Sequence, residues 1–178
     1  MRQQLTRDRL RALMREIART APRRLACRVY LVGGGTAVHA GWRPSTIDAD
    51  LYAEDGSVFR DIQGIKERLN INIEFTRPEH FVPDLRDSAS RHVFIETTGG
   101  GPVSFYHYDP YAQVLAKVVR GFDRDLDDAR HFVASGMVDS RTLRALVEQI
   151  PDSAWAKYPN LSRSAVLGAL EDFLREVE

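Results

Sequence analysis

Cysteine is nearly absent from this 178-residue chain, in which Cys27 is the only one. A single cysteine excludes an intramolecular disulfide and a zinc site built from several cysteines, and it fits a reducing compartment. Long hydrophobic runs are missing too, because no apolar stretch approaches the roughly 20 residues that a membrane-spanning helix needs. We therefore expect a cytoplasmic protein with no membrane partner.

Several ligand-binding motifs are also lacking. The five histidines are scattered and form neither a ligand cluster nor a Ser-His-Asp arrangement. No Gly-Lys-Ser/Thr closes the glycine run at residues 33–35, which excludes a P-loop. A dinucleotide-binding fingerprint fails because Val38 occupies its third glycine position and the next acidic residues follow too soon. Internal repeats and low-complexity segments are absent as well.

The net charge is zero, but it is unevenly divided. Residues 1–28 hold nine arginines against Asp8 and Glu16, a balance of +7 that leaves −7 for the remainder. Apolar residues recur within this arm at the spacing of one helix face, at Leu10, Leu13, Met14 and Ile17. Thr6 is the expected N-cap. The arginines form either a solvated helix face or a basic surface that attracts an RNA backbone, and an Arg-rich transit peptide is a third alternative.

Strand and helix patterns alternate up to residue 108, and only helical patterns follow. Strands are predicted at residues 28–32, 46–51, 70–76, 92–97 and 103–108. Helices are predicted at residues 57–69, 109–120, 123–136, 140–149 and 162–177. The chain is thus expected to have an α/β (α+β) fold, with a small mixed sheet flanked by helices in residues 1–108. Residues 109–178 form a helical C-terminal part, expected to belong to the same compact unit.

The most informative segment is residues 33–50. Its first part, Gly33-Gly34-Gly35-Thr36, follows a short apolar strand and leads into a helical stretch predicted at residues 36–40. A helix start offers backbone N–H groups and a positive dipole end, both of which suit a polyphosphate. Glycines allow the backbone to approach the phosphate closely.

The second part of this segment is an acid pair on a strand. Alternate side chains of a strand share a face, so Thr46, Asp48 and Asp50 point to one side. The opposite side carries the apolar residues Ile47, Ala49 and Leu51. Cα atoms two residues apart are separated by roughly 6.5–7 Å, so both carboxylates can hold one Mg²⁺ or Mn²⁺ that also touches phosphates. The alternative is the solvated face of an edge strand.

These residues resemble the polymerase-β-like nucleotidyltransferase superfamily, whose signature is Gly-Gly or Gly-Ser opening a helix, followed by Asp-x-Asp or Asp-x-Glu. The pattern Arg43-x-x-Thr46 before the acid pair resembles that of the AbiEii-like toxin nucleotidyltransferases of type IV toxin–antitoxin systems. The resemblance resumes at Asp109-Pro110-Tyr111-Ala112 and continues to Asp128, covering residues 28–135. It implies that Arg43 and Thr46 contact phosphate or orient Asp48, although Thr46 can equally satisfy the backbone of a turn.

In that superfamily a third carboxylate comes from the strand after the Asp-x-Asp strand, and Glu74 matches it. The strand at residues 70–76 directs Ile71, Ile73 and Phe75 to the core and leaves Glu74 on the opposite side. Glu74 would complete the metal site and help to deprotonate the acceptor hydroxyl. The family more often has Asp there, and the alternative is a plain surface glutamate.

Two further residues are implied downstream. Lys117 would neutralise the triphosphate, and the alternative is a surface lysine. A late aspartate supports the site in the toxin-like families, and Asp128 is chosen over Asp125. Gly121 is expected to interrupt the helix between Lys117 and these acids.

The sequence therefore predicts a metal-dependent nucleotidyltransferase that moves an NMP from an NTP to an acceptor hydroxyl and releases pyrophosphate. For the toxin-like relatives the acceptor is the 3′ end of tRNA, and an antitoxin protein restrains the enzyme. The basic N-terminal arm would draw tRNA to the site. Two alternatives stay open: transfer to a small molecule or a protein, as in AMP transfer, and a non-catalytic nucleotide-binding module of the same fold.

Overall fold

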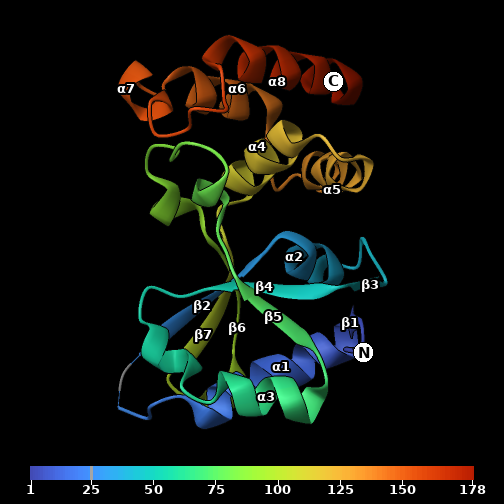
Figure 1. Cartoon of the computed structure of the whole chain (residues 1–178), viewed down its shortest axis with the longest axis vertical. Coiled ribbons are helices and arrows are strands. Elements are labelled where there is room, and N and C mark those ends of the chain that lie inside the picture. Colours follow the sequence, from blue (N-terminus) through green and yellow to red (C-terminus); the bar gives the residue numbers. More distant parts are fainter. Residues whose placement is uncertain (25) are drawn as a thin grey trace. The chain divides into compact units, whose positions relative to one another are not determined.

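The structure is a computed structural model that describes residues 1–24 and 26–178, and it contains two compact units (Figure 1). The first unit comprises Met1–Arg77 and Val93–Tyr108, and the second comprises Pro78–His92 and Asp109–Glu178. The sequence places all of residues 1–108 in the core, whereas the segment Pro78–His92 belongs to the second unit. Its contacts explain why, because the Tyr158 hydroxyl donates a hydrogen bond of 2.6 Å to the Glu79 carbonyl oxygen.

The first unit is built on a mixed five-stranded sheet in the order β5-β4-β2-β7-β6. Its strands are β2 (Cys27–Val32), β4 (Asp48–Tyr52), β5 (Asn72–Phe75), β6 (Val93–Thr97) and β7 (Val103–His107). Strand β2 is antiparallel to β4 and parallel to β7, while β4 is parallel to β5 and β6 is antiparallel to β7. Two short strands, β1 (Leu5–Thr6) and β3 (Ser45–Thr46), pair with each other. The predicted mixed α/β fold is confirmed.

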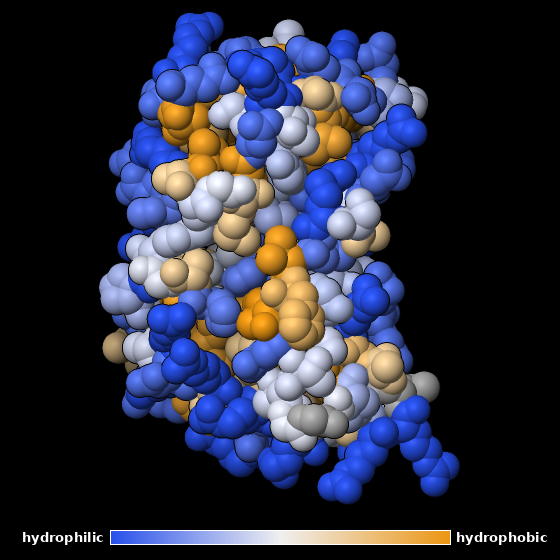
Figure 2. Space-filling view, turned by 180° about the vertical axis from the view of Figure 1, so that it is seen from behind, coloured by the Kyte–Doolittle hydropathy of each residue, from blue (hydrophilic) through white to orange (hydrophobic). Residues whose placement is uncertain are grey.

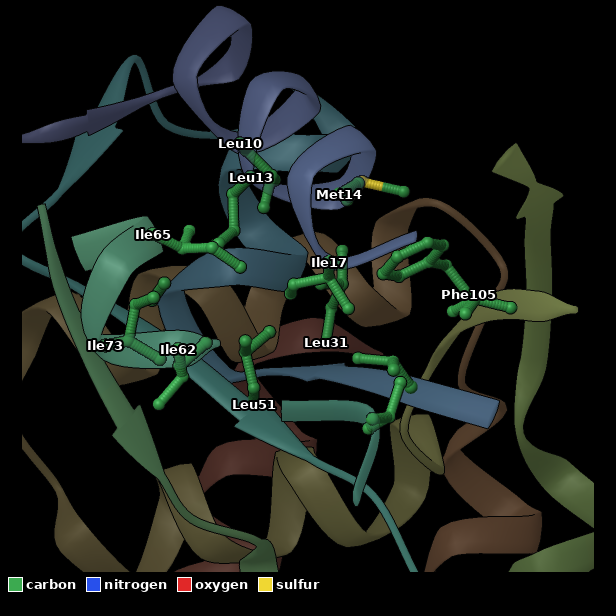
Figure 3. Packing of buried hydrophobic residues seen from close by; sticks show 14 of the residues in the cluster. Leu10, Leu13, Met14, Ile17, Leu31, Leu51, Ile62, Ile65, Ile73 and Phe105 are labelled. Carbon is green, nitrogen blue, oxygen red and sulfur yellow. The ribbon is translucent and has the colours of Figure 1, made fainter. Parts of the chain in front are cut away.

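Helices α1 (Arg7–Thr20) and α3 (Ile62–Leu69) pack side by side against one face of this sheet (Figures 1 and 3). The predicted apolar stripe of α1 is confirmed, because Leu10, Leu13 and Ile17 are completely buried. Figure 3 shows these side chains among residues of α3 and of the sheet, including Ile65, Leu31, Leu51 and Phe105. Each such burial is worth about 1.5–3 kcal/mol, so the stripe fixes α1 on the sheet.

The predicted start of α1 is confirmed, whereas the predicted start of α3 is wrong. The Thr6 hydroxyl accepts a hydrogen bond from the Arg9 N–H at 3.4 Å, which confirms the N-cap of α1. The helix predicted at residues 57–69 begins later, at Ile62, after the 3₁₀ turn η1 (Gly56–Phe59). The reason is local: Asp55 accepts from the Ser57 N–H and caps the 3₁₀ turn in place of an α-helix.

Two apolar side chains predicted to face the core are exposed. Ile47 is 60% exposed because it lies between β3 and β4, outside the alternation of either strand. Phe75 is 50% exposed at the end of β5, and the centroid of its ring lies 4.8 Å from that of Phe59. Such isolated exposed residues are ordinary. Figure 2 shows one face of the molecule, where hydrophobic residues gather in small patches among hydrophilic ones.

The second unit is helical. Its helices are α4 (Pro110–Arg120), α5 (Asp123–Ala134), α6 (Ser140–Glu148), α7 (Asp152–Trp155) and α8 (Arg163–Val177), preceded by the 3₁₀ turns η2 (Pro78–His80) and η3 (Ser88–Arg91). The predicted start of α4 is confirmed, since the Asp109 carboxylate accepts from the Tyr111 N–H at 2.9 Å. Gly121 ends α4 with φ +69°, as expected from its sequence position. In residues 1–24 and 26–178, every helix is too short or too polar to cross a bilayer.

Candidate active site in the first unit

The glycine run lies where β2 passes into α2 (Gly33–Ala40). Helix α2 begins at Gly33 itself, three residues earlier than the turn predicted at Thr36. Gly33 has φ +56°, a left-handed conformation that glycine adopts without the strain of a side chain. The positive end of the α2 dipole therefore lies at the glycine run, as an anion site requires.

Side chains of strands β3 and β4 lie directly against this turn. A Cβ atom added to Gly33 would lie 2.8 Å from Oδ2 of Asp50, and one added to Gly34 would lie 2.4 Å from Oγ1 of Thr46. Gly35 differs, because its nearest neighbour would be the Asp50 carbonyl oxygen at 3.7 Å, an ordinary contact. The first two glycines thus make room for Asp50 and Thr46, which no local sequence pattern indicates.

The two aspartates of β4 share one face of the strand. Ala49 and Leu51 are buried at 1% exposure, whereas Asp48 and Asp50 are half-buried, so the predicted alternation is confirmed from Asp48 onward. The Asn72 amide of β5 donates a hydrogen bond of 2.9 Å to Oδ1 of Asp48. Asn72 therefore orients one carboxylate of the pair.

Glu74 is brought beside the pair by strand register. Strands β4 and β5 are parallel, with Asp48 opposite Asn72 and Asp50 opposite Glu74. Neighbouring strands are about 4.8 Å apart, so the side chains of Asp50 and Glu74 leave the same face of the sheet close together. Glu74 is exposed, in agreement with both of its predicted roles, a third carboxylate and a surface glutamate.

The acid pair has the donor chemistry that Mg²⁺ or Mn²⁺ prefers, namely carboxylate oxygens near a phosphate-binding turn. Across the part of the chain that the structure describes, no group of three His, Cys, Asp or Glu side chains is arranged to hold a metal ion. The roles of Asp48 and Asp50 as ligands, and of Glu74 as the third carboxylate, stay predictions.

A chain of buried hydrogen bonds connects the start of α2 with strands β2 and β7. The Thr36 hydroxyl donates to the Leu31 carbonyl oxygen at 3.2 Å, and His107 Nδ1 lies 3.1 Å from the same hydroxyl. Since the hydroxyl proton is used on Leu31, Nδ1 of His107 is the donor to Thr36. Burial, together with the neighbouring His39, lowers the pKa of His107 to about 3, so its ring is neutral. No local sequence pattern indicates these hydrogen bonds, because Leu31 and His107 become neighbours only through β2–β7 pairing.

The remaining predicted residues of the first unit lie around α2. Thr46 belongs to β3 and contacts the glycine run through its side chain, as described above. Arg43 follows the end of α2 at Gly41 and donates its backbone N–H to the Ala37 carbonyl oxygen at 3.3 Å. The contact of the Arg43 guanidinium with phosphate stays a prediction.

Aromatic residues occupy the sheet face that carries the acid pair. Tyr30 lies opposite Tyr52 on one side and Tyr106 on the other, with ring centroids 5.9 and 5.8 Å away. The Cζ atom of Arg28 lies 5.2 Å from the ring centroid of Tyr106, and that of Arg77 lies 5.0 Å from the ring centroid of Tyr52. This face therefore combines stacked rings, cations and carboxylates.

Lys117 and Asp128 belong to the second unit, where they form a buried ion cluster. Lys117 is 4% exposed, which contradicts the alternative of a surface lysine. Its Nζ lies 2.7 Å from Oδ2 of Asp128 and 3.3 Å from Oδ1 of Asp125. The break at Gly121 allows α5 to fold back so that both aspartates reach Lys117. Asp125 is thus a second, more distant partner of Lys117, while a contact of Lys117 with a triphosphate stays a prediction.

The Asp109-Pro110 motif also has a partner that sequence reasoning missed. Asp109 is fully buried, and its carboxylate lies 2.8 Å from the Arg91 guanidinium. The Asp109 N–H donates to His92 Nδ1 at 2.9 Å. These contacts lie within the second unit and tie the segment Pro78–His92 to the start of α4.

The comparisons with known proteins agree with the resemblance at the level of the family. Residues 8–174 match the family described as nucleotidyltransferase of unknown function (DUF6036). No curated protein and no solved structure matches the chain. Because the match covers nearly all of the sequence, this protein belongs to that nucleotidyltransferase family.

Proposed function

We propose that the protein is a metal-dependent nucleotidyltransferase that transfers an NMP from an NTP to the 3′ end of tRNA and acts as a toxin. The observation that carries the proposal is the contact between Asp50 and the start of α2. It puts a carboxylate suited to a divalent cation beside a helix start suited to a polyphosphate. An NTP carrying its cation needs both.

Each residue of the site would have a distinct task. The N–H groups at Gly33, Gly34 and Gly35 bind the β- and γ-phosphates, while Asp48 and Asp50 hold Mg²⁺ or Mn²⁺. That ion would offset the negative charge of the triphosphate. Asn72 keeps the Asp48 carboxylate turned toward the shared face through its hydrogen bond.

The reaction is an in-line displacement at the α-phosphorus. The oxygen of the acceptor hydroxyl forms a bond to the α-phosphorus as the bond to the bridging oxygen of the β-phosphate breaks. Pyrophosphate leaves with the electron pair of that bond. Glu74, next to Asp50 in strand register, accepts the proton of the hydroxyl.

A tRNA acceptor is supported by charge and by the toxin-like resemblance. Arginines of α1 are exposed on the side away from its buried stripe, at Arg7, Arg11, Arg15 and Arg19. Cations on one face of a helix attract a phosphate backbone. An antitoxin protein is the second proposed partner, because an enzyme that modifies tRNA of its own cell must be restrained.

A labelling assay distinguishes the acceptors. Purified protein is incubated with Mg²⁺, a tRNA pool and each of the four α-³²P-labelled NTPs. Label at the 3′ end of tRNA is the expected result. Label on a co-expressed protein or on a small-molecule hydroxyl, with tRNA unlabelled, would replace tRNA by that acceptor. A toxin also arrests growth when overexpressed, and growth equal to that of an Asp48→Ala strain would contradict the toxin role.

A further inference from the structure

A groove runs between α1 and the turn that joins β6 to β7 in the first unit. A hollow of about 830 Å³ is lined by Arg15, Arg19 and Arg23 together with the turn at residues 98–102. A second hollow of about 400 Å³ is lined by Arg11, Arg15 and His39 together with residues 96–99. The two share Arg15, Thr98 and Gly99, so they form one continuous feature, here named the basic groove.

Three of the four arginines that line the basic groove, all except Arg19, lack an ion-pair partner among the described residues. Within the described residues, Arg11, Arg15 and Arg23 form no ion pair, and all three are exposed. Arg19 is paired with Glu16 at 2.9 Å, and Glu96 is the acidic residue that lines the groove. The pKa of His39 is lowered first by burial and then by Arg7, while Glu96 raises it and Arg11 lowers it further.

The spacing of these arginines suits a chain of phosphates. Residues 11, 15 and 19 recur every four positions along α1, a rise of about 6 Å for each step. A single phosphate would engage one such cation, whereas a row of guanidinium groups matches the repeated charges of a nucleic-acid strand. The opposite wall includes Gly99 and Gly101, which have no side chains and so leave space for a bulky nucleic-acid strand.

The groove also leads toward the candidate active site. His39 lies near the end of α2, whose other end is Gly33 beside Asp50. An eight-residue helix is about 12 Å long, so the two sites are separated by the length of α2. Within this unit the ring centroids of His39 and His107 are 5.1 Å apart. His107 in turn forms a hydrogen bond with Thr36 of the glycine run.

We propose that the basic groove binds the sugar–phosphate backbone of the RNA whose 3′ end is extended. This inference rests on the proposed function, because it gives the acceptor a path to Asp48 and Asp50. Arg11, Arg15 and Arg23 contact successive phosphates, and the 3′-terminal hydroxyl continues past α2 toward the acid pair. An acidic protein partner in the groove is the competing occupant.

The test measures RNA binding apart from catalysis. Fluorescein-labelled tRNA is titrated without NTP at several salt concentrations, with wild type and with the triple variant Arg11→Ala/Arg15→Ala/Arg23→Ala. We expect Kd to rise more than about tenfold and the slope of log K against log salt to fall in magnitude by about 2. Arg15→Ala alone, at the position shared by both hollows, should give the largest single effect and serves if the triple variant does not fold.

A charge-matched control separates the groove from net charge. The triple variant Arg86→Ala/Arg141→Ala/Arg175→Ala removes three exposed arginines of the second unit and should bind tRNA like wild type. Equal weakening by both triple variants, or unchanged binding by the groove variant, would overturn the proposal. Wild type that binds no tRNA would also overturn it and favour the protein partner.

Asp48→Asn distinguishes failure of the groove from failure of the function. It should bind tRNA like wild type and transfer no NMP. If the groove variants bind tRNA normally while Asp48→Asn abolishes transfer, the groove is wrong and the function stands. If the groove variants lose binding but wild type transfers no NMP, the groove binds RNA and the proposed reaction is wrong.

Discussion

Oδ2 of Asp50 lies so close to Gly33 that a Cβ atom on the glycine would stand only 2.8 Å away. The two residues come from different elements, the start of α2 and strand β4. The turn proposed to bind phosphate and the carboxylate proposed to bind a cation are thereby held together before any substrate arrives. Such preorganisation is what an NTP site needs, because charge must be placed without rearrangement.

Replacing Gly33 should damage both the fold and the activity. In Gly33→Ala the new methyl group meets Asp50, and the backbone at φ +56° is strained. We expect a loss of about 1–3 kcal/mol in the free energy of unfolding, measured by urea denaturation, and a larger loss of NMP transfer. Gly35→Ala is the matched control, since its nearest contact is an ordinary 3.7 Å, and it should unfold like wild type. Equal stability of both variants would contradict the account of the glycine run.

Asn72 should matter for metal affinity, because it orients Asp48 across a 2.9 Å hydrogen bond. In Asn72→Ala the carboxylate loses this partner, and we expect the Mg²⁺ concentration for half-maximal transfer to rise about 10–100-fold. The rate at saturating Mg²⁺ should change much less. A variant with an unchanged Mg²⁺ requirement would remove Asn72 from the site.

Lys117 should be a large contributor to the stability of the second unit. Lys117→Met removes the buried cation that lies 2.7 Å from Asp128 and 3.3 Å from Asp125, although Arg120 still lies 3.4 Å from Asp125, and we expect a loss of about 3–5 kcal/mol in urea denaturation. The triple variant Lys117→Met/Asp125→Asn/Asp128→Asn should recover part of that loss. The exposed pair of Arg175 and Asp172 is the control, since Arg175→Ala should cost less than about 0.5 kcal/mol. A small effect of Lys117→Met would contradict the buried cluster.

His107 should make stability depend on pH. Its pKa in the folded protein is lowered to about 3 from 6.5, so between these values the unfolded chain binds a proton that the folded chain does not. The free energy of unfolding therefore falls as the pH drops from 6.5 toward 3, by up to about 1.4 kcal/mol per pH unit, and this dependence is absent above pH 6.5. His107→Gln should flatten this slope, whereas His80→Gln, an exposed site, should not. Urea denaturation from pH 7 to pH 4 measures it, and parallel curves for wild type and His107→Gln would contradict it.

Local patterns predicted the elements that build the site. The Thr6 cap, the apolar stripe of α1 and the shared face of Asp48 and Asp50 follow from spacing within one element, and the structure has all three. The bond from Asn72 to Asp48 and the contact of Asp50 with Gly33 depend on strand register and helix placement, which no short segment encodes.

The same limit explains three differences between the sequence-based expectations and the structure. Ile47 fits the strand alternation but lies between two strands, where tertiary pairing ends the pattern. Lys117 reads as polar by composition, yet α5 brings two carboxylates over it and allows it to be buried. Pro78–His92 follows β5 in the chain but packs with helices that come later in the sequence. These three differences concern contacts between elements, whereas the late start of α3 has a local cause in the Asp55 cap.

Asp48 and Asp50 are proposed to form the site of nucleotidyl transfer, and the fate of label from two positions of the NTP tests this assignment. With wild type we predict that α-³²P label moves to the acceptor while γ-³²P label leaves as pyrophosphate. Asp48→Asn should reduce both by at least about 100-fold, whereas Asp84→Asn, at an exposed aspartate, should leave both unchanged. Transfer that persists in Asp48→Asn, or wild type that releases γ-label as inorganic phosphate with no α-label on any acceptor, would contradict the account.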